Sequence, residues 1–201
     1  SEKVFNMKRL LLILILTFSF QSLSKADDIS DFQIEGMSIG DSLLEFMNID
    51  DIKRQLIEND HLYFYTDKKF ISIIVTGLKS EIYNKRIIAE VKRKNDLKFI
   101  IYSVRGEIIF PGISKCLDQR KNITTDLKSM FPNAKKREWI RDFPGYKDSK
   151  YKIHGTNFDL DSGDSIGIAC SRYPRDLTPK RGDNFYVFIR SGEFENWLRK
   201  Y

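Results

Sequence analysis

From His61 to Phe110, hydrophobic residues recur at every second position along much of the chain. This is the period of a β-strand with one buried face. Polar turns at Asn95-Asp96 and at Arg105-Gly106-Glu107 are predicted to divide the stretch into short strands, which Pro111-Gly112 ends. Short strands joined by tight turns are typical of an antiparallel meander.

Elsewhere the hydrophobic residues take up helical spacing, or alternate again after the central part of the chain. Helices are expected over residues 41–47, 49–57, 113–131 and 192–201. Further strands are expected over residues 151–161, 165–171 and 184–190. The basic cluster Lys135-Lys136-Arg137 is interpreted as a loop between them. These elements predict an α+β fold with a single domain, an antiparallel β-meander sheet and helices packed on one side.

The N-terminal residues have the three parts of a secretory signal peptide. Met7-Lys8-Arg9 is a short positive segment, Leu10 to Phe20 is an uncharged apolar run, and Ser24-Lys25-Ala26 offers small residues for a cut before Asp27. The apolar run is too short to span a bilayer comfortably. We therefore expect residues 1–26 to be upstream residues and a cleavable leader, and residues 27–201 to be a single globular domain. An uncleaved segment that tethers the domain to the membrane is the alternative.

The net charge of +6 is a weak signal. The leader carries four of the basic residues and one acidic residue, so the rest of the chain keeps only a mild positive excess. Together with export, this argues against a nucleic-acid partner. The chain also lacks a recognisable cofactor motif, and no cofactor is expected.

Cys116 and Cys170 are the only cysteines of the chain. Cys170 lies on the apolar side of a predicted strand, and Cys116 lies on the inner stripe of a predicted helix. Two thiols in an oxidising compartment most simply form one disulfide bond. The alternative, a redox-active or nucleophilic pair, is less favoured because a C-x-x-C motif is missing and apolar surroundings make a thiol inert.

Two small groups of polar residues are candidate sites. His154 has Asp159 and Asp161 nearby in the sequence, so a His–Asp pair is conceivable, although no nucleophile motif accompanies it. Asp159, Asp161 and Asp164 crowd a predicted hairpin end, where carboxylates can chelate a hard cation such as Ca²⁺. Turn chemistry explains the same aspartates more simply, so no metal site is predicted.

The segment from Ser171 to Asp183 is longer than an ordinary hairpin connection, and long loops are often functional. Its candidate binding residues are Arg172, Tyr173, Arg175, Lys180 and Arg181. Arginine is suited to carboxylate or phosphate partners. The alternative is a solvated loop whose basic residues keep it soluble.

Two stretches resemble a known family. Residues 34–44 (IEGMSIGDSLL) and residues 191–198 (SGEFENWL) are similar to a family of small uncharacterised exported proteins of marine alphaproteobacteria of the SAR11 type. Residues 34–38 (I-x-G-M-S) at the entry into a helix also resemble small envelope domains of the outer-membrane assembly lipoprotein and β-lactamase-inhibitor type, although a lipidation cysteine is missing. The resemblance implies a periplasmic location and assigns no activity.

The sequence therefore predicts a periplasmic or secreted accessory protein that binds an envelope protein or a small anionic ligand. It has no catalytic motif. A hydrolase that uses His154 with a nearby Asp and an unidentified Ser is one alternative, and a membrane-tethered periplasmic domain is another.

Overall fold

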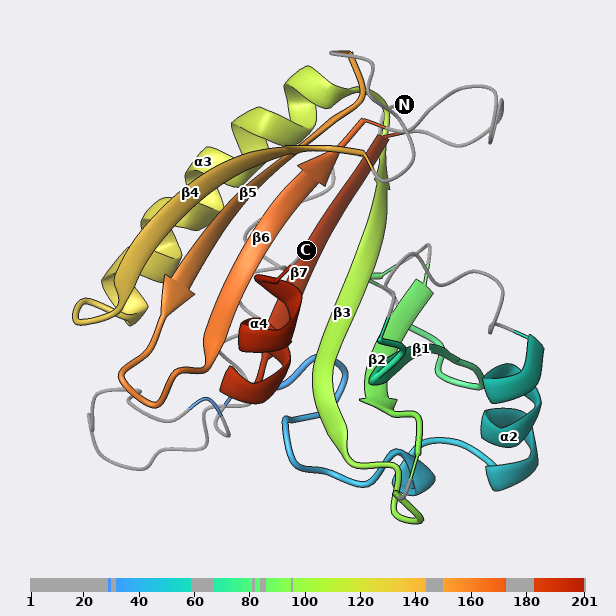
Figure 1. The fold of residues 1–201 in the computed structure, drawn as a ribbon. Coiled ribbons are helices and arrows are strands. Elements are labelled where there is room, and N and C mark those ends of the chain that lie inside the picture. Colours follow the sequence, from blue (N-terminus) through green and yellow to red (C-terminus); the bar gives the residue numbers. More distant parts are fainter. Residues whose placement is uncertain are drawn as a thin grey trace.

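The computed structural model describes residues 29, 32–58, 67–80, 82–83, 86–94, 96–143, 150–172 and 183–200. Seven antiparallel strands form one sheet in the order β1-β2-β3-β7-β6-β5-β4 (Figure 1). The strands are β1 (Phe70–Val75), β2 (Arg86–Lys92), β3 (Ile101–Phe110), β4 (Lys135–Asp142), β5 (Lys152–Asp159), β6 (Ser165–Ser171) and β7 (Asp183–Arg190). The predicted single α+β domain with an antiparallel sheet is confirmed.

The sheet consists of two meanders, β1 to β3 and β4 to β7, which α3 (Ile113–Met130) connects. The last strand, β7, pairs with β3 along eight residues of each strand and joins the two halves. The other helical elements are η2 (Leu43–Glu45), α2 (Ile49–Glu58) and α4 (Gly192–Leu198). Ser191 caps α4, because its Oγ accepts a hydrogen bond from the Phe194 amide.

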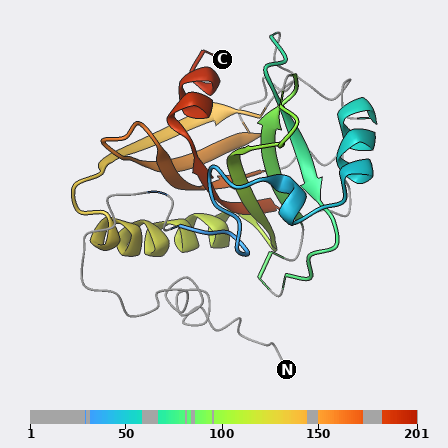
Figure 2. The ribbon, with the colours of Figure 1, turned by 90° about the horizontal axis from the view of Figure 1, so that it is seen from below.

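The two faces of the sheet carry different layers, because successive side chains of a strand point to opposite faces. The α3 face holds the main core, in which Ile168 and Ile189 are buried together with Leu127 of α3. The opposite face, the α4 face, packs Phe194 and Trp197 of α4 against other aromatic residues. Figure 2 shows α3 and α4 on opposite sides of the sheet. Helices were expected on one side of the sheet only, but α4 packs on the side opposite α3.

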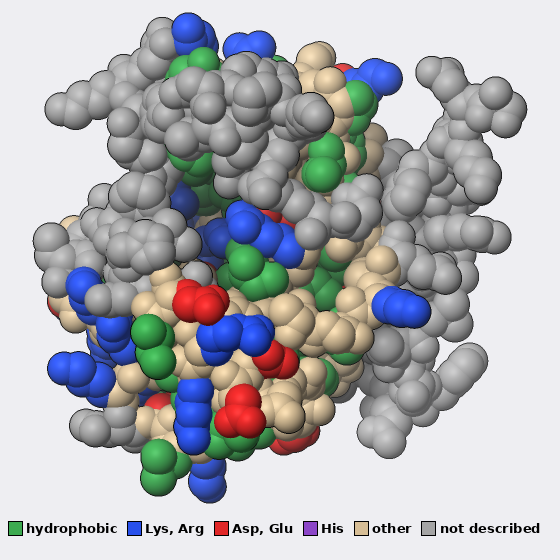
Figure 3. All heavy atoms as spheres, turned by 90° about the vertical axis from the view of Figure 1, so that its right-hand side faces the viewer, with side chains coloured by type: hydrophobic (Ala, Val, Ile, Leu, Met, Phe, Trp, Pro, Cys, Tyr) green, Lys and Arg blue, Asp and Glu red, His purple; other side chains and the backbone are tan. Residues whose placement is uncertain are grey.

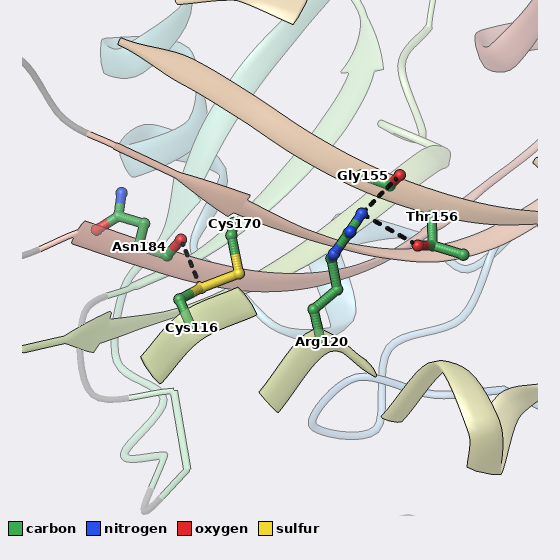
Figure 4. The surroundings of a disulfide bond; sticks show 6 residues. All are labelled: Cys116, Arg120, Gly155, Thr156, Cys170 and Asn184. Atoms are coloured by element: carbon green, nitrogen blue, oxygen red, sulfur yellow. Dashed lines mark hydrogen bonds between the residues drawn. A yellow bond between two sulfur atoms is a disulfide. The ribbon is translucent and has the colours of Figure 1, made fainter. Parts of the chain in front are cut away.

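The disulfide bond between Cys116 and Cys170 is present, with 5.9 Å between the Cα atoms (Figure 4). One turn further along α3, Arg120 donates hydrogen bonds to the Gly155 carbonyl and to Thr156 Oγ1, at 3.1 and 3.3 Å. The disulfide bond and the hydrogen bonds of Arg120 together fix α3 across β5 and β6.

One edge of the sheet is closed by a side chain. Gln55 of α2 donates its amide to the carbonyl of Ile74 in β1 and accepts the amide of the same residue, both at 2.8 Å. The side chain thereby replaces the hydrogen bonds of a further strand at this edge. The opposite edge strand, β4, carries mostly charged residues, which is another way to discourage strand pairing.

Two local predictions were wrong. Arg105-Gly106-Glu107 is not a turn but part of the continuous strand β3. The ring of Tyr83 lies where a side chain on residue 106 would be, so glycine makes room for packing here. The basic cluster at residues 135–137 begins strand β4 rather than forming a loop.

The predicted leader, residues 1–26, lies outside the described residues. Among the helices that the structure does describe, none is both long and apolar enough to cross a membrane. The disulfide bond is typical of proteins of an oxidising compartment.

Candidate functional site

The strand register divides the α4 face into rows of side chains that run across the sheet. One row crosses β5, β6, β7 and β3 and holds Asp159, Ser165, Arg190 and Ser103. Six residues away along β7, another row holds Arg141, Ile153, Ser171, Asn184 and Ile109. Because a strand rises about 3.3 Å per residue, the two rows are roughly 20 Å apart. Figure 1 shows α4 at one end of these strands.

At the α4 end, a buried carboxylate organises the polar side chains. Glu195 is 3% exposed and accepts hydrogen bonds from Arg190 at 3.1 Å and Arg137 at 2.7 Å. Burial favours the neutral form of Glu195, but the charge of Arg190 and the hydrogen bond from it, together with Arg137, outweigh this effect and lower the pKa of Glu195. These hydrogen bonds tie α4 to β4 and β7, and we call this network the lock.

The aspartates of the predicted hairpin end belong to the same lock. Asp159 forms ion pairs with Arg137 at 3.1 Å and Arg199 at 3.2 Å, and Asp164 accepts the amide of Gly192 at 2.7 Å. Asp161 is exposed in the turn. In the part of the chain that the structure describes, no group of three or more His, Cys, Asp or Glu residues has a metal-binding arrangement.

The other end of the α4 face carries a different set of residues, which we call the distal patch. It consists of the row Trp139, Gly155, Ala169, Tyr186 and Glu107 and the neighbouring row Arg141, Ile153, Ser171, Asn184 and Ile109. Its members Trp139, Ile153, Ala169 and Tyr186 form a small hydrophobic cluster with Phe143 and Phe188, separate from the main core.

Glycine shapes the floor of the distal patch. A Cβ on Gly155 would lie 2.1 Å from the ring of Trp139, so this ring lies flat on the strand beside it. The indole N–H of Trp139 donates to the Oδ1 of Asn157 at 2.7 Å, which fixes the ring. Of the two aromatic rings in these rows, Tyr186 is buried and Trp139 is partly exposed.

Three arginines stack on aromatic rings across this face. The guanidinium carbons of Arg105, Arg141 and Arg190 lie 5.5, 5.0 and 3.8 Å from the centroids of Tyr186, Trp139 and Phe188. Such cation–π contacts hold a guanidinium in a defined position. Of these three arginines, Arg141 belongs to the distal patch.

The charges of these arginines are not equally balanced. Arg86 and Arg105 share the buried carboxylate of Glu107, at 2.9 and 3.2 Å, and Arg190 has Glu195. Arg141 is exposed, and within the described residues it has no acidic side chain within 4 Å. Burial lowers the pKa of Arg190, Glu195 acts in the opposite direction, and the charge of Arg141 lowers it further. Among the described residues, the charge of Arg141 is thus not balanced by an acidic side chain.

Two side-chain oxygens in the same row as Arg141 are buried without a hydrogen-bond partner. Ser171 and Asn184 lie opposite each other on β6 and β7 and are each 2% exposed. The Oγ of Ser171 neither donates nor accepts a hydrogen bond, and the Oδ1 of Asn184 accepts none. A buried unpaired polar group costs about 1–3 kcal/mol, so such groups call for a functional explanation.

The predicted binding loop joins this row. Ser171 precedes it and Asn184 follows it in the chain, so its two ends lie at the distal patch. Arg172 is exposed at the end of β6. The remaining predicted residues, Tyr173, Arg175, Lys180 and Arg181, lie outside the described residues.

His154 lies on the α3 face, next to Cys170 on the neighbouring strand. Asp159 is five residues away on the same strand and therefore lies on the opposite face. Partial burial lowers the pKa of His154, and the charges of Arg120 and Lys152 lower it further. The structure therefore does not bring His154 and Asp159 together as a catalytic pair.

The side of the molecule that carries α2 lacks such an organisation. In the coloured part of Figure 3, basic, acidic and hydrophobic side chains are interspersed. This is the pattern of an ordinary solvated surface.

Comparison of the chain with protein-family models, curated proteins and solved structures finds no match. The site must therefore be interpreted from its own chemistry. Trp139, Arg141 and Asn184 were not predicted from the sequence to be residues of a binding site. A usable signal was present in the alternation, because Ser171 and Asn184 are the polar ends of otherwise apolar strands.

Proposed function

We propose that this chain is an exported accessory protein of the periplasm or the extracellular space and that it binds a ligand on the distal patch. The export signal predicted at the N-terminus, the disulfide bond and the resemblance to small exported proteins support this location. The absence of a catalytic motif in the sequence favours binding over chemistry.

The observation that carries the proposal is the pair of buried unpaired side chains, Ser171 and Asn184, in the row that also holds Arg141. At the α4 end of the same face, the polar groups of the lock have partners within the protein. A ligand that supplies hydrogen bonds to the distal pair would remove the cost of leaving it unpaired. Aromatic rings beside a few polar groups are also a common composition of binding sites.

A thermal-shift screen of organic acids, sugars, amino acids and nucleotides tests this function. A ligand at one hundred times its dissociation constant stabilises the folded protein by about 2.7 kcal/mol. The site variant is Ile109→Glu, which changes a 41% exposed side chain next to Asn184. The control is Ile57→Glu, which makes the same change at a 78% exposed position of α2.

The proposal predicts that at least one compound stabilises the wild type and the Ile57→Glu variant but not the Ile109→Glu variant. If no compound stabilises the wild type, or if both variants respond as the wild type does, the distal patch is not the binding site.

A further inference from the structure

Two glutamates of α4, Glu193 and Glu195, connect the helix to both halves of the sheet. The basic partners of Glu193 lie just before β1 and in β2, and those of Glu195 lie in β4 and β7. The four partners are Lys69, Lys92, Arg137 and Arg190. Lys92 also lies 4.4 Å from the ring centroid of Tyr102 in β3, and this ring packs against α4 as well.

Three further carboxylates contact α4 from the rest of the chain. Asp67, ahead of β1, accepts the indole N–H of Trp197 at 2.7 Å. Asp164, in the turn between β5 and β6, accepts the first amide of α4. Asp159 of β5 pairs with Arg199, which directly follows the helix. Carboxylates therefore hold α4 at both of its ends, and such contacts are strongest when the carboxylate is ionised.

Protonation of these carboxylates would leave the basic side chains around α4 without counter-charges. Arg190 is 6% exposed, and a buried charge without a partner is costly, so its return to water would favour opening of the helix. Burial opposes the ionised forms of Glu193 and Glu195, but their basic partners outweigh this effect and lower the pKa of both. Their ionised forms therefore stabilise the docked helix at neutral pH, and this stabilisation is lost as the pH falls from about 4.5 through the folded pKa values.

The contacts that hold the strands together depend less on carboxylates. Backbone hydrogen bonds join the seven strands, and the Cys116–Cys170 disulfide bond fixes α3. Arg120 of α3 donates to a backbone carbonyl and to a hydroxyl. Acid should therefore weaken the attachment of α4 more than the pairing of the strands. Only Ser191 separates α4 from β7, so the helix can turn away while β7 keeps its partners in the sheet.

We propose that α4 is an acid-sensitive latch, which leaves the sheet at low pH while the seven strands stay folded. The open form uncovers Phe70, whose buried ring lies 5.1 and 5.2 Å from the rings of Phe194 and Trp197 in the closed form. It also uncovers the guanidinium groups of Arg137 and Arg190. Acid thus opens an aromatic and basic surface that α4 covers at neutral pH. Opening of one element ahead of the rest is a common form of local unfolding.

Amide hydrogen exchange, followed by nuclear magnetic resonance between pH 7 and pH 2.5 and corrected for the intrinsic effect of pH, tests the proposal. The amides of Glu195 and Arg199 report on α4, because they donate to the carbonyls of Ser191 and Glu195. The amides of β6 and β7 report on the sheet. The variants are Glu195→Gln and the control Glu138→Gln, which removes an exposed acid that pairs with Lys136 on the other face of β4.

We expect the wild type to lose protection in α4 below about pH 4.5, in a pH range where β6 and β7 are still protected. At pH 7, the protection of α4 in the Glu195→Gln variant should be lower than in the wild type by about 100- to 1,000-fold, since a buried ion pair has lost one partner. The Glu138→Gln variant should lose protection in α4 at the same pH as the wild type.

Two results for the wild type would overturn the proposal: α4 stays protected down to pH 2.5, or α4 and the strands lose protection at the same pH. The wild-type titration decides between these outcomes even if the Glu195→Gln variant does not fold. Equal effects of the Glu195→Gln and Glu138→Gln substitutions on α4 would also contradict the latch.

Discussion

The buried carboxylate of Glu195 should be one of the main contributors to the stability of the fold. It faces Arg190, which is itself almost fully buried, and its Oε1 also accepts from Arg137. Removing one member of a buried ion pair leaves the other charge buried without a partner, which costs about 3–5 kcal/mol. The Glu195→Gln substitution keeps the shape of the side chain but leaves Arg190 in this state, so we expect a loss of this size.

Glu193 provides a matched control in the same turn of α4. It pairs with Lys69 at 2.9 Å and Lys92 at 3.1 Å, but all three side chains are partly exposed to solvent. Exposed ion pairs contribute about 0–1 kcal/mol, so Glu193→Gln should cost less than 1 kcal/mol. Urea unfolding followed by circular dichroism and by tryptophan fluorescence measures both variants. Equal losses for the two substitutions would refute the reasoning.

The pH dependence offers an independent check of the same group. The pKa of Glu195 is lowered in the folded protein, so the ionised carboxylate stabilises the fold at neutral pH. This stabilisation is lost as the pH falls from about 4.5 through the folded pKa. The free energy of unfolding should therefore fall more between pH 7 and pH 3 in the wild type than in the Glu195→Gln variant. Parallel pH profiles would contradict the assignment.

Three further predictions concern the packing of the sheet. Gly167→Ala should cost about 1–3 kcal/mol, because the new Cβ would lie 2.5 Å from the buried ring of Phe188 and 2.6 Å from a backbone carbonyl. Gly155→Ala should cost less, because its Cβ would meet the partly exposed ring of Trp139, which yields more easily than a buried ring or a backbone carbonyl. The reverse order in urea unfolding would contradict this. Reducing the Cys116–Cys170 bond, which spans 54 residues of sequence, should lower stability by about 4 kcal/mol, and equal urea midpoints with and without reductant would count against it. Gln55→Leu should leave the backbone of Ile74 unpaired at an open edge, with a loss of about 1–3 kcal/mol and concentration-dependent association in light scattering. A variant that is as stable and as monodisperse as the wild type would show that Gln55 does not close the edge.

The hydrophobic period was sufficient to predict most elements of the fold. It located α3, α4 and the strands around Ile168 and Val187, since each has one strongly apolar face. It misplaced a turn at Arg105-Gly106-Glu107, because glycine between charged residues is also the signature of a turn. The partners that make these residues a strand, Arg86 and Tyr186, come from distant parts of the chain.

The order of the strands could not be deduced from the period alone. The pairing of β7 with β3 depends on where α3 carries the chain, and no local pattern records this. The disulfide was predictable because only two cysteines exist and both lie on apolar faces. The distal patch was not, because Arg141, Ser171 and Asn184 become neighbours only through the register of four strands.

Nuclear magnetic resonance of the uniformly ¹⁵N-labelled protein tests the central claim, that the distal patch is a binding site, most directly. Titration with a compound that the thermal-shift screen identifies should shift the amide signals of Arg141, Ile153, Ser171 and Asn184. The signals of α2, on another side of the molecule, should stay unchanged. Shifts confined to α2 or to the α3 face, or no shifts at all, would contradict the account.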